Sequence, residues 1–164
     1  MRKGFSTGVW KGKDGWDKLS TRYEERSVGV LRRNIVLEQN RTMQDLKHRT
    51  QKFAIEAWKL CAQIPKSREF DAWARQLLRC SSSVGANYRA SQRAKSTADF
   101  IYKLKIVEEE ADESIYWLEL FQEVLGPAQK ENQSLIKEAK ELLAIVVASI
   151  KTARKNSNKL NLKH

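Results

Sequence analysis

The sequence predicts an all-α protein, an up-down-up-down antiparallel four-helix bundle. Apolar residues recur three and four positions apart over four long segments, which is the spacing of one helix face. Only two prolines and seven glycines occur in 164 residues, and four of the glycines fall within the first fifteen positions. Because a many-stranded β fold needs many turn residues, that class is excluded.

The first predicted helix spans Asp45–Ile64. Pro65 ends it, because proline disfavours a helical conformation in the residue before it. Thr42 has the spacing of a capping box with Asp45. The second predicted helix spans Arg68–Ala94. The stripes expected to be buried are Leu46, Thr50, Phe53, Ala57, Leu60 and Ile64 on the first helix, and Phe70, Ala74, Leu77, Ser81, Val84 and Tyr88 on the second.

The third predicted helix spans Thr97–Leu125. Ser96 and Asp99 have the spacing of a capping box, and Gly126 stands where a left-handed cap residue is common. The fourth predicted helix spans Ala128–Ala153. The stripes expected to be buried are Phe100, Leu104, Val107, Ala111, Ser114, Leu118, Phe121 and Leu125 on the third helix, and Leu135, Ala139, Leu142, Val146, Ile150 and Ala153 on the fourth.

The domain organisation follows from these segments. Residues 1–40 lack a sustained period and are expected to form an N-terminal extension, poorly ordered or docked. Residues 41–155 form the bundle, and residues 156–164 a basic tail. Further apolar residues flank the stripes, which indicates either a wide intramolecular core or a surface for self-association. These flanking residues are Ile101, Ile115, Trp117, Leu143 and Val147.

Composition narrows the function classes. With 41% apolar and 31% charged residues, the chain is neither disordered throughout nor embedded in a membrane. No apolar run approaches the roughly 20 residues of a transmembrane helix, and the start lacks the apolar stretch of a secretory signal. We therefore expect a cytoplasmic protein. Its net charge of +11 favours nucleic acid or acidic surfaces as partners, although such a charge also serves solubility alone.

Four arginines form a candidate RNA-binding stripe. At about 100° per residue, Arg75, Arg79, Arg89 and Arg93 share the face of the second helix opposite its apolar stripe. Such a line is roughly 27 Å long and suits a phosphate backbone, because a guanidinium pairs with phosphate through a planar fork. Lys95 completes this predicted set. The alternatives are a solvated face, or pairing with acidic residues of a neighbouring subunit.

One acidic segment interrupts the basic chain. Residues 96–126 carry two basic and eight acidic residues, five of them between positions 108 and 113. A di-iron site in a bundle pairs Glu-x-x-His motifs with carboxylates from facing helices, and no such motif occurs here. We therefore expect no metal and no cofactor. Instead, Glu109, Asp112 or Glu113 is expected to satisfy Asn87, serine hydroxyls or arginines across a helix interface.

The middle of the second predicted helix is unusually rich in small residues. Gly85 costs about 1 kcal/mol relative to alanine, which indicates that another helix backbone approaches closely there. Asn87 needs a hydrogen-bond partner if it is buried, and Tyr88 lies on the apolar stripe. Trp117 is expected in the core or at a subunit interface. Cys61 and Cys80 are offset by roughly 13 Å between antiparallel helices, so no disulfide is expected.

A run of residues across the second and third predicted helices resembles a known family. It comprises SSVGANYRA at residues 82–90, ADF at 98–100, VEEEADE at 107–113 and YWLEL at 116–120. These motifs resemble the small four-helix bundle proteins encoded in intervening sequences of bacterial 23S ribosomal RNA genes. The resemblance covers roughly residues 45–155.

The resemblance implies a homopentamer of four-helix protomers. The architecture is similar to that of the accessory variability proteins of diversity-generating retroelements, which are basic pentameric barrels that bind nucleic acid. No enzymatic activity comes with the family, and its genetic location implies an association with ribosomal RNA or the ribosome.

Two functions are therefore expected, and a third is rejected. The leading hypothesis is a non-enzymatic homo-oligomeric bundle that binds RNA through basic helix faces. The alternative is a protein-interaction scaffold, whose charge serves solubility. A carboxylate metalloenzyme lacks the required motif.

Overall fold

The computed structural model describes residues 45–126 and 130–161, together with the exposed side chains of Val28, Val30 and Leu37. The four helices between residues 45 and 161 lie within the unit Gln44–His164, and no described residue belongs to a strand. The all-α prediction is thus confirmed. The predicted extension 1–40 lies outside the described residues except for those three positions, and so does the capping residue Thr42.

The helix boundaries follow the predicted segments closely. The first helix covers residues 45–63 and ends just before Pro65, as predicted. Helices α2 (Arg68–Ser91) and α3 (Thr97–Leu125) follow, and α4 covers Lys130–Asn161. Three ends differ from the prediction. The first helix stops one residue before the predicted Ile64, α2 stops three residues earlier than expected, and α4 continues eight residues beyond Ala153.

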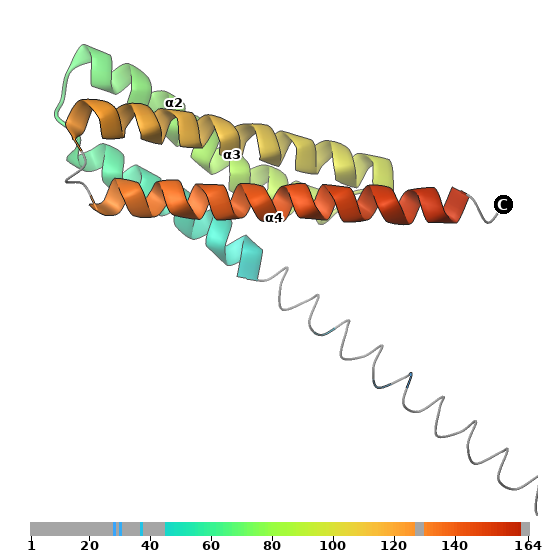
Figure 1. Ribbon diagram of the computed structural model, residues 1–164. Helices are drawn as coiled ribbons and strands as arrows, with labels where there is room; N and C mark the ends of the chain where they lie inside the picture. The colour runs from blue at the N-terminus through green and yellow to red at the C-terminus, as the bar shows by residue number, and fades with distance from the viewer. Residues whose placement is uncertain (1–27, 29, 31–36, 38–44, 127–129, 162–164) are drawn as a thin grey trace, which may run out of the picture. The chain divides into compact units, whose positions relative to one another are not determined.

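The four helices pack side by side (Figure 1). Helix α2 packs on α3, and α3 packs on α4. Phe70 stacks on Phe121 while Cys80 contacts Ser114, so α2 and α3 run antiparallel. The 45–63 helix contacts α2 at Gly85. It is joined to α4 by Arg49, whose guanidinium donates to both carboxylate oxygens of Glu138 at 2.9 Å.

The core consists almost entirely of the predicted stripes. Phe53, Leu77, Leu118 and Phe121 are at most 1% exposed. Of the flanking residues, Ile115 is buried, and Ile101, Trp117 and Leu143 are partly buried against the core. These four flanking residues therefore pack within the chain, as expected for a wide intramolecular core.

Capping explains where two helices begin. The Ser96 hydroxyl accepts a hydrogen bond from the backbone N–H of Asp99 at 3.1 Å, as predicted. The Asp99 carboxylate accepts from the backbone N–H of Lys95, one residue earlier than a standard capping box. Ser67 caps α2 in the same way, by accepting from Phe70 at 3.2 Å. The serine caps satisfy N–H groups that a helix start leaves without intrahelical partners.

Glycine 126 ends α3 with a positive φ of 87°, a value that only glycine adopts without strain. Its ψ of 163° lies outside the left-handed helical region that the sequence suggested. The Gly126 N–H still bonds to the carbonyl of Gln122 at 3.0 Å, so the last turn is closed.

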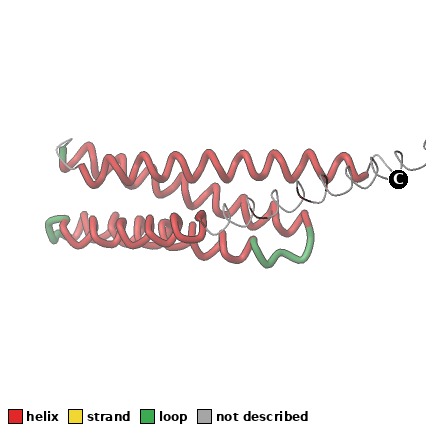
Figure 2. The backbone as a smooth tube through the Cα atoms, turned by 90° about the horizontal axis from the view of Figure 1, so that it is seen from below, coloured by secondary structure: helices red, strands yellow, loops and turns green. Residues whose placement is uncertain are grey.

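The connections lie at opposite ends of the helices. Figure 2 shows the loop at residues 64–67 at one end and the turn at residues 92–96 at the other. The last turns of α4 extend past the level of the 92–96 turn (Figures 1 and 2). Within the described residues, no helix is long and apolar enough to cross a membrane.

Candidate nucleic-acid interface

The predicted arginine stripe is divided by the structure. Arg75, Arg79 and Arg89 are exposed on α2, but α2 ends at Ser91, so Arg93 lies in the following turn. The four arginines therefore do not form one rigid line, and this part of the prediction is wrong. The chain turns at this point through i to i−3 hydrogen bonds, from the Arg93 N–H to Ala90 and from the Ala94 N–H to Ser91.

Arg79 is held by acidic residues of α3. One guanidinium nitrogen donates to the Glu113 carboxylate at 2.6 Å, and another lies 3.4 Å from Glu110. The hydrogen bond from Arg79 lowers the pKa of Glu113, whereas desolvation raises the pKa of Glu110 despite the same arginine. Arginine pairing across a helix interface was predicted for Glu113, and the partner belongs to the same chain.

The other acidic and small residues behave differently. Glu109 and Asp112 are exposed and have no ion-pair partner in the described part of the chain. The Asn87 amide donates to the Ser83 carbonyl of its own helix at 3.0 Å, so no carboxylate satisfies it. Of the alternatives expected for these carboxylates, the structure therefore has the arginine and not Asn87, which is only partly buried and has a carbonyl one turn earlier within reach.

Trp117, predicted in the core or at a subunit interface, belongs to an aromatic cluster between α2 and α3. The ring centroid of Trp117 lies 6.4 Å from that of Trp73 and 5.1 Å from that of Tyr116. The Trp117 indole N–H donates to the Glu113 carboxylate at 3.1 Å. Tyr88 is 5% exposed, and desolvation raises its pKa to about 12. Both cysteines are free, as predicted, and Cys80 accepts a bond from the Ser114 hydroxyl.

Basic side chains gather at one end of the bundle. A small groove is lined by Gln92 and Ser96 on one side and by Ala153 and Asn156 on the other, so this part of α4 lies beside the 92–96 turn. This brings the turn and the last turns of α4 to one place, which we call the basic end. Its six exposed basic residues are Arg93, Lys95, Lys151, Arg154, Lys155 and Lys159.

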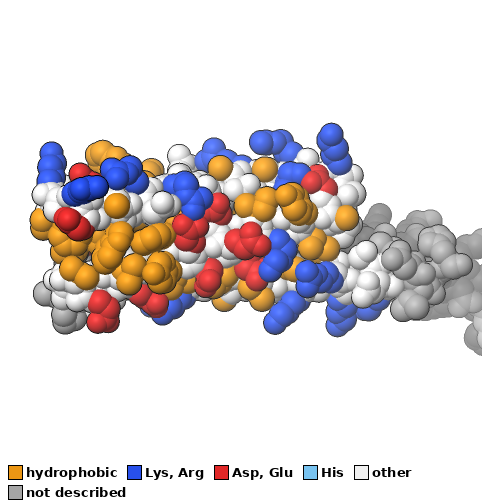
Figure 3. Space-filling model, turned by 90° about the horizontal axis from the view of Figure 1, so that it is seen from above, with side chains coloured by type: hydrophobic (Ala, Val, Ile, Leu, Met, Phe, Trp, Pro, Cys, Tyr) orange, Lys and Arg blue, Asp and Glu red, His pale blue; other side chains and the backbone are white. Residues whose placement is uncertain are grey.

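The basic end contains few compensating charges. No Asp or Glu occurs in residues 86–98 or 142–161. The nearest acidic residue in α3 is Asp99, which already pairs with Lys103. None of the six basic residues forms an ion pair within the described chain. Figure 3 shows acidic side chains at mid-length on one face, with basic ones toward the end with the turn and further basic ones at the opposite end.

Only part of the basic end was predicted from the sequence. Arg93 and Lys95 were predicted, but the α4 residues were missed because α4 was expected to end near Ala153. The available signal was the absence of any glycine or proline after Pro127, which leaves the helix without a stop.

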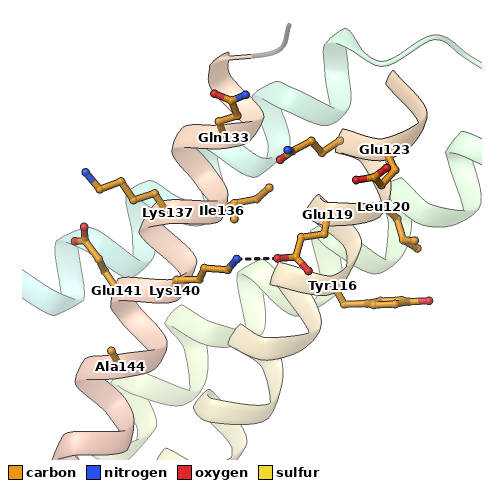
Figure 4. Close-up of a pocket in the computed structure, with 11 residues that line it drawn as sticks. Tyr116, Glu119, Leu120, Glu123, Gln133, Ile136, Lys137, Lys140, Glu141 and Ala144 are labelled. Carbon is orange, nitrogen blue, oxygen red and sulfur yellow. Dashed lines mark hydrogen bonds and ion pairs between the residues drawn. The ribbon is translucent and has the colours of Figure 1, made fainter. Parts of the chain in front are cut away.

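A groove of about 970 Å³ lies elsewhere, between α3 and α4. Figure 4 shows Lys140 reaching across it to Glu119, where the two form an ion pair of 2.8 Å. Ile136 points between the helices, while Lys137 and Glu141 point away. No cysteine, histidine or serine lines this groove, so it contains no nucleophile–histidine pair.

Metal ligation has no support in the described residues. No group of three or more histidine, cysteine, aspartate or glutamate side chains in that part of the chain has an arrangement that holds a metal ion.

Comparison with known proteins places this geometry in a family. The profile of the 23S rRNA-intervening sequence proteins matches residues 43–148, which include most of the four helices and the 92–96 turn. The chain belongs to this family. The matched range stops before Lys151, so the α4 part of the basic end lies beyond it.

A solved structure agrees with the family match. A crystal structure of a protein of unknown function from the S23 ribosomal protein family of Bacteroides thetaiotaomicron is similar, with 31% identity and a TM-score of 0.60. The similarity covers 65% of this chain and 98% of that one. Among curated proteins, none matches the chain.

Proposed function

We propose that the chain is a non-enzymatic, cytoplasmic RNA-binding protein, an up-down-up-down bundle that assembles into a ring-like homopentamer. Its RNA partner is ribosomal or another structured RNA, consistent with the family's name. The observation that carries the proposal is the basic end, where six exposed basic residues form no side-chain ion pair in the described chain.

The physical basis is electrostatic. RNA presents closely spaced phosphates, and each lysine or arginine that neutralises one releases a condensed counterion. Arg79 is a poor candidate for this role, because it must first leave two carboxylates. Arg93 and Arg154 carry no such cost, since neither pairs with an acidic side chain in the described chain.

Assembly would strengthen weak contacts. A ring repeats the basic end once per subunit, so one RNA that spans several copies is bound with an effective concentration set by the ring geometry. The pentamer rests on the family resemblance. Native mass spectrometry tests it, with an expected mass five times the 19.0 kDa of one chain.

The direct test of the function is an anisotropy titration of labelled structured RNA at several salt concentrations. Phosphate contacts predict that the logarithm of the binding constant falls linearly and steeply with the logarithm of salt concentration. Absence of binding at low salt, to ribosomal RNA fragments and other structured RNAs alike, would contradict the proposal.

A protein-interaction scaffold is the second candidate. It is favoured by the α3–α4 groove, whose lining includes Tyr116, an aromatic residue that is 54% exposed. Large exposed apolar side chains of this kind mark protein interfaces when they are contiguous. The salt titration separates the two functions, because docking on an apolar surface does not require a steep salt dependence.

A further inference from the structure

A second groove lies between the 45–63 helix and α2, and it differs in chemistry from the other grooves. Its volume is about 510 Å³. The 45–63 helix contributes Trp58 and Ile55 to the lining, and α2 contributes a wall of small residues followed by one cation. The complete lining is Thr50, Gln51, Ala54, Ile55, Trp58, Ser82, Gly85, Ala86 and Arg89.

Trp58 is the unusual residue of this groove. Its side chain is 61% exposed, and it makes no ring contact with another aromatic residue of the described chain. Ile55, one turn earlier, is 47% exposed. Tryptophan is usually largely buried, so an exposed indole beside an exposed isoleucine requires an explanation other than core packing.

The opposite wall leaves the indole accessible. Ser82, Gly85 and Ala86 have short side chains or none, and Ser82 and Ala86 are exposed. Gly85 lies close to the Thr50 backbone, so the helices approach closely at the floor. A flat ring can therefore lie against Trp58 without meeting a bulky side chain from α2.

The charge around the groove is positive. Arg89 is the only charged residue that lines it, and no carboxylate does. One Arg89 nitrogen donates to the Gln51 side chain at 3.0 Å, which orients the guanidinium and leaves its other donors available. Arg75 lies exposed two helical turns before Ser82, on the same face of α2.

We propose that this groove binds an unpaired nucleotide of RNA, with its base stacked on Trp58 and a neighbouring phosphate paired with Arg89. The inference rests on the proposed function and specifies the form of RNA that is bound. Gln51, which holds Arg89, and Trp58 are seven residues apart, or about 10 Å along the helix. This is the scale of a nucleotide with an adjacent phosphate. Stacking on an aromatic ring together with arginine pairing is how proteins hold single-stranded RNA.

The groove therefore has a different task from the basic end. Lysines and arginines at the basic end attract any phosphate backbone, paired or unpaired. Trp58 needs a base face, which a continuous duplex does not expose. The predicted consequence is a preference for RNA with single-stranded loops or ends over fully paired RNA of the same charge.

The experiment compares two fluorescently labelled RNAs of equal length, an oligouridylate and a fully paired blunt duplex. Both are titrated against the full chain and against Trp58→Leu, which removes the ring but keeps an apolar side chain. Tyr102→Leu is the matched control, because Tyr102 is 66% exposed on α3 and does not line the groove. Circular dichroism confirms that each variant retains its helices.

Trp58→Leu should weaken binding of the oligouridylate by at least about fivefold and leave binding of the duplex unchanged. Trp58→Phe should restore most of the loss, because phenylalanine retains a stacking face. Tyr102→Leu should change neither affinity. Arg89→Gln should lower the salt slope for the oligouridylate by about 0.7.

Three results would overturn the inference. Equal effects of Trp58→Leu on both RNAs, or no effect on either, would remove the stacking role while the proposed RNA binding stands. A change in oligomeric mass in Trp58→Leu would identify the groove as a contact between copies of the chain. If the native chain binds neither RNA at low salt, the proposed function and this site fail together.

Discussion

Replacing Gly85 tests how closely α2 approaches the 45–63 helix. A Cβ atom built at Gly85 would lie 3.5 Å from the Thr50 carbonyl oxygen, which is ordinary van der Waals contact. An alanine therefore fits. It should stabilise the helix by about 1 kcal/mol, because glycine costs that much in a helix interior. Burial of the added methyl contributes about 0.8 kcal/mol more.

A valine at the same position should have the opposite effect. Its two methyl groups extend beyond the Cβ, toward a backbone that cannot retreat as a flexible side chain would. Overpacking of this kind costs about 1–3 kcal/mol. Urea unfolding followed by circular dichroism measures the free energy of unfolding of Gly85→Ala, Gly85→Val and the native chain.

The expected order of stability is alanine, then glycine, then valine. If Gly85→Ala lowers the free energy of unfolding by more than about 1 kcal/mol, the helices approach more closely than the structure has them, and the reasoning is refuted. Equal stability of Gly85→Val and Gly85→Ala would show that the floor of the groove is looser than described.

Three further predictions concern individual side chains. Glu113 has a lowered pKa because Arg79 donates a hydrogen bond to its charged form. Its contribution to stability is therefore present above its ordinary pKa and is lost as pH falls through the lowered value. Glu113→Gln should reduce this loss of stability in thermal melts between about pH 5 and 3. Asn132 is 1% exposed, its Nδ2 atom donates to the Leu118 carbonyl at 3.0 Å, and its Oδ1 atom has no donor in the described chain. Asn132→Leu removes the hydrogen bond and the unsatisfied oxygen together, so the free energy of unfolding in urea should change by no more than about 1 kcal/mol. A loss of more than about 2 kcal/mol would show that another group donates to this oxygen. Burial raises the pKa of Cys61 from 9.0 to about 11. Its alkylation by iodoacetamide at pH 8, followed by mass spectrometry, should therefore be about a hundredfold slower than in the urea-unfolded chain. Equal rates would contradict the burial of this thiol.

The helices were predictable where local signals mark their ends. Ser96 and Gly126 bracket α3, and its bounds were predicted to the residue. Nothing comparable marks the end of α4, because the residues after Ala153 are polar but permit a helix. The polar composition predicts a tail at residues 156–164, although it indicates only that no core lies beneath those turns.

The partners of the arginines on α2 could not be predicted from a projection of that helix alone. The projection places side chains around one axis, but it contains no information on which charges the neighbouring helices present. Arg79 meets Glu113 of α3, whereas Arg89 meets Gln51 of the 45–63 helix. Both contacts join residues more than thirty positions apart, so only the packed structure separates the two arginines.

Trp58 was missed for a related reason. The buried stripe of its helix passes through Phe53, Ala57 and Leu60, and Trp58 falls beside it. A single apolar residue beside a stripe is common, since many surfaces carry such residues. Its importance emerges only when Ala86 and Arg89 of α2 are seen across the groove.

The central claim is that RNA binds at the basic end, and paired variants test it most directly. One variant changes Arg93, Lys95, Arg154 and Lys155 to glutamine. The other makes the same change at four exposed basic residues toward the opposite end, namely Lys66, Arg68, Lys130 and Lys137. Both lose the same charge, so only the position of that charge differs.

The measurement is the salt dependence of structured RNA binding by the native chain and both variants. We expect that the basic-end variant loses about 3–4 from the slope of the logarithmic plot, and that the opposite-end variant stays close to native. Equal losses in both variants would show that net charge alone governs binding, and the basic end would then be no specific interface.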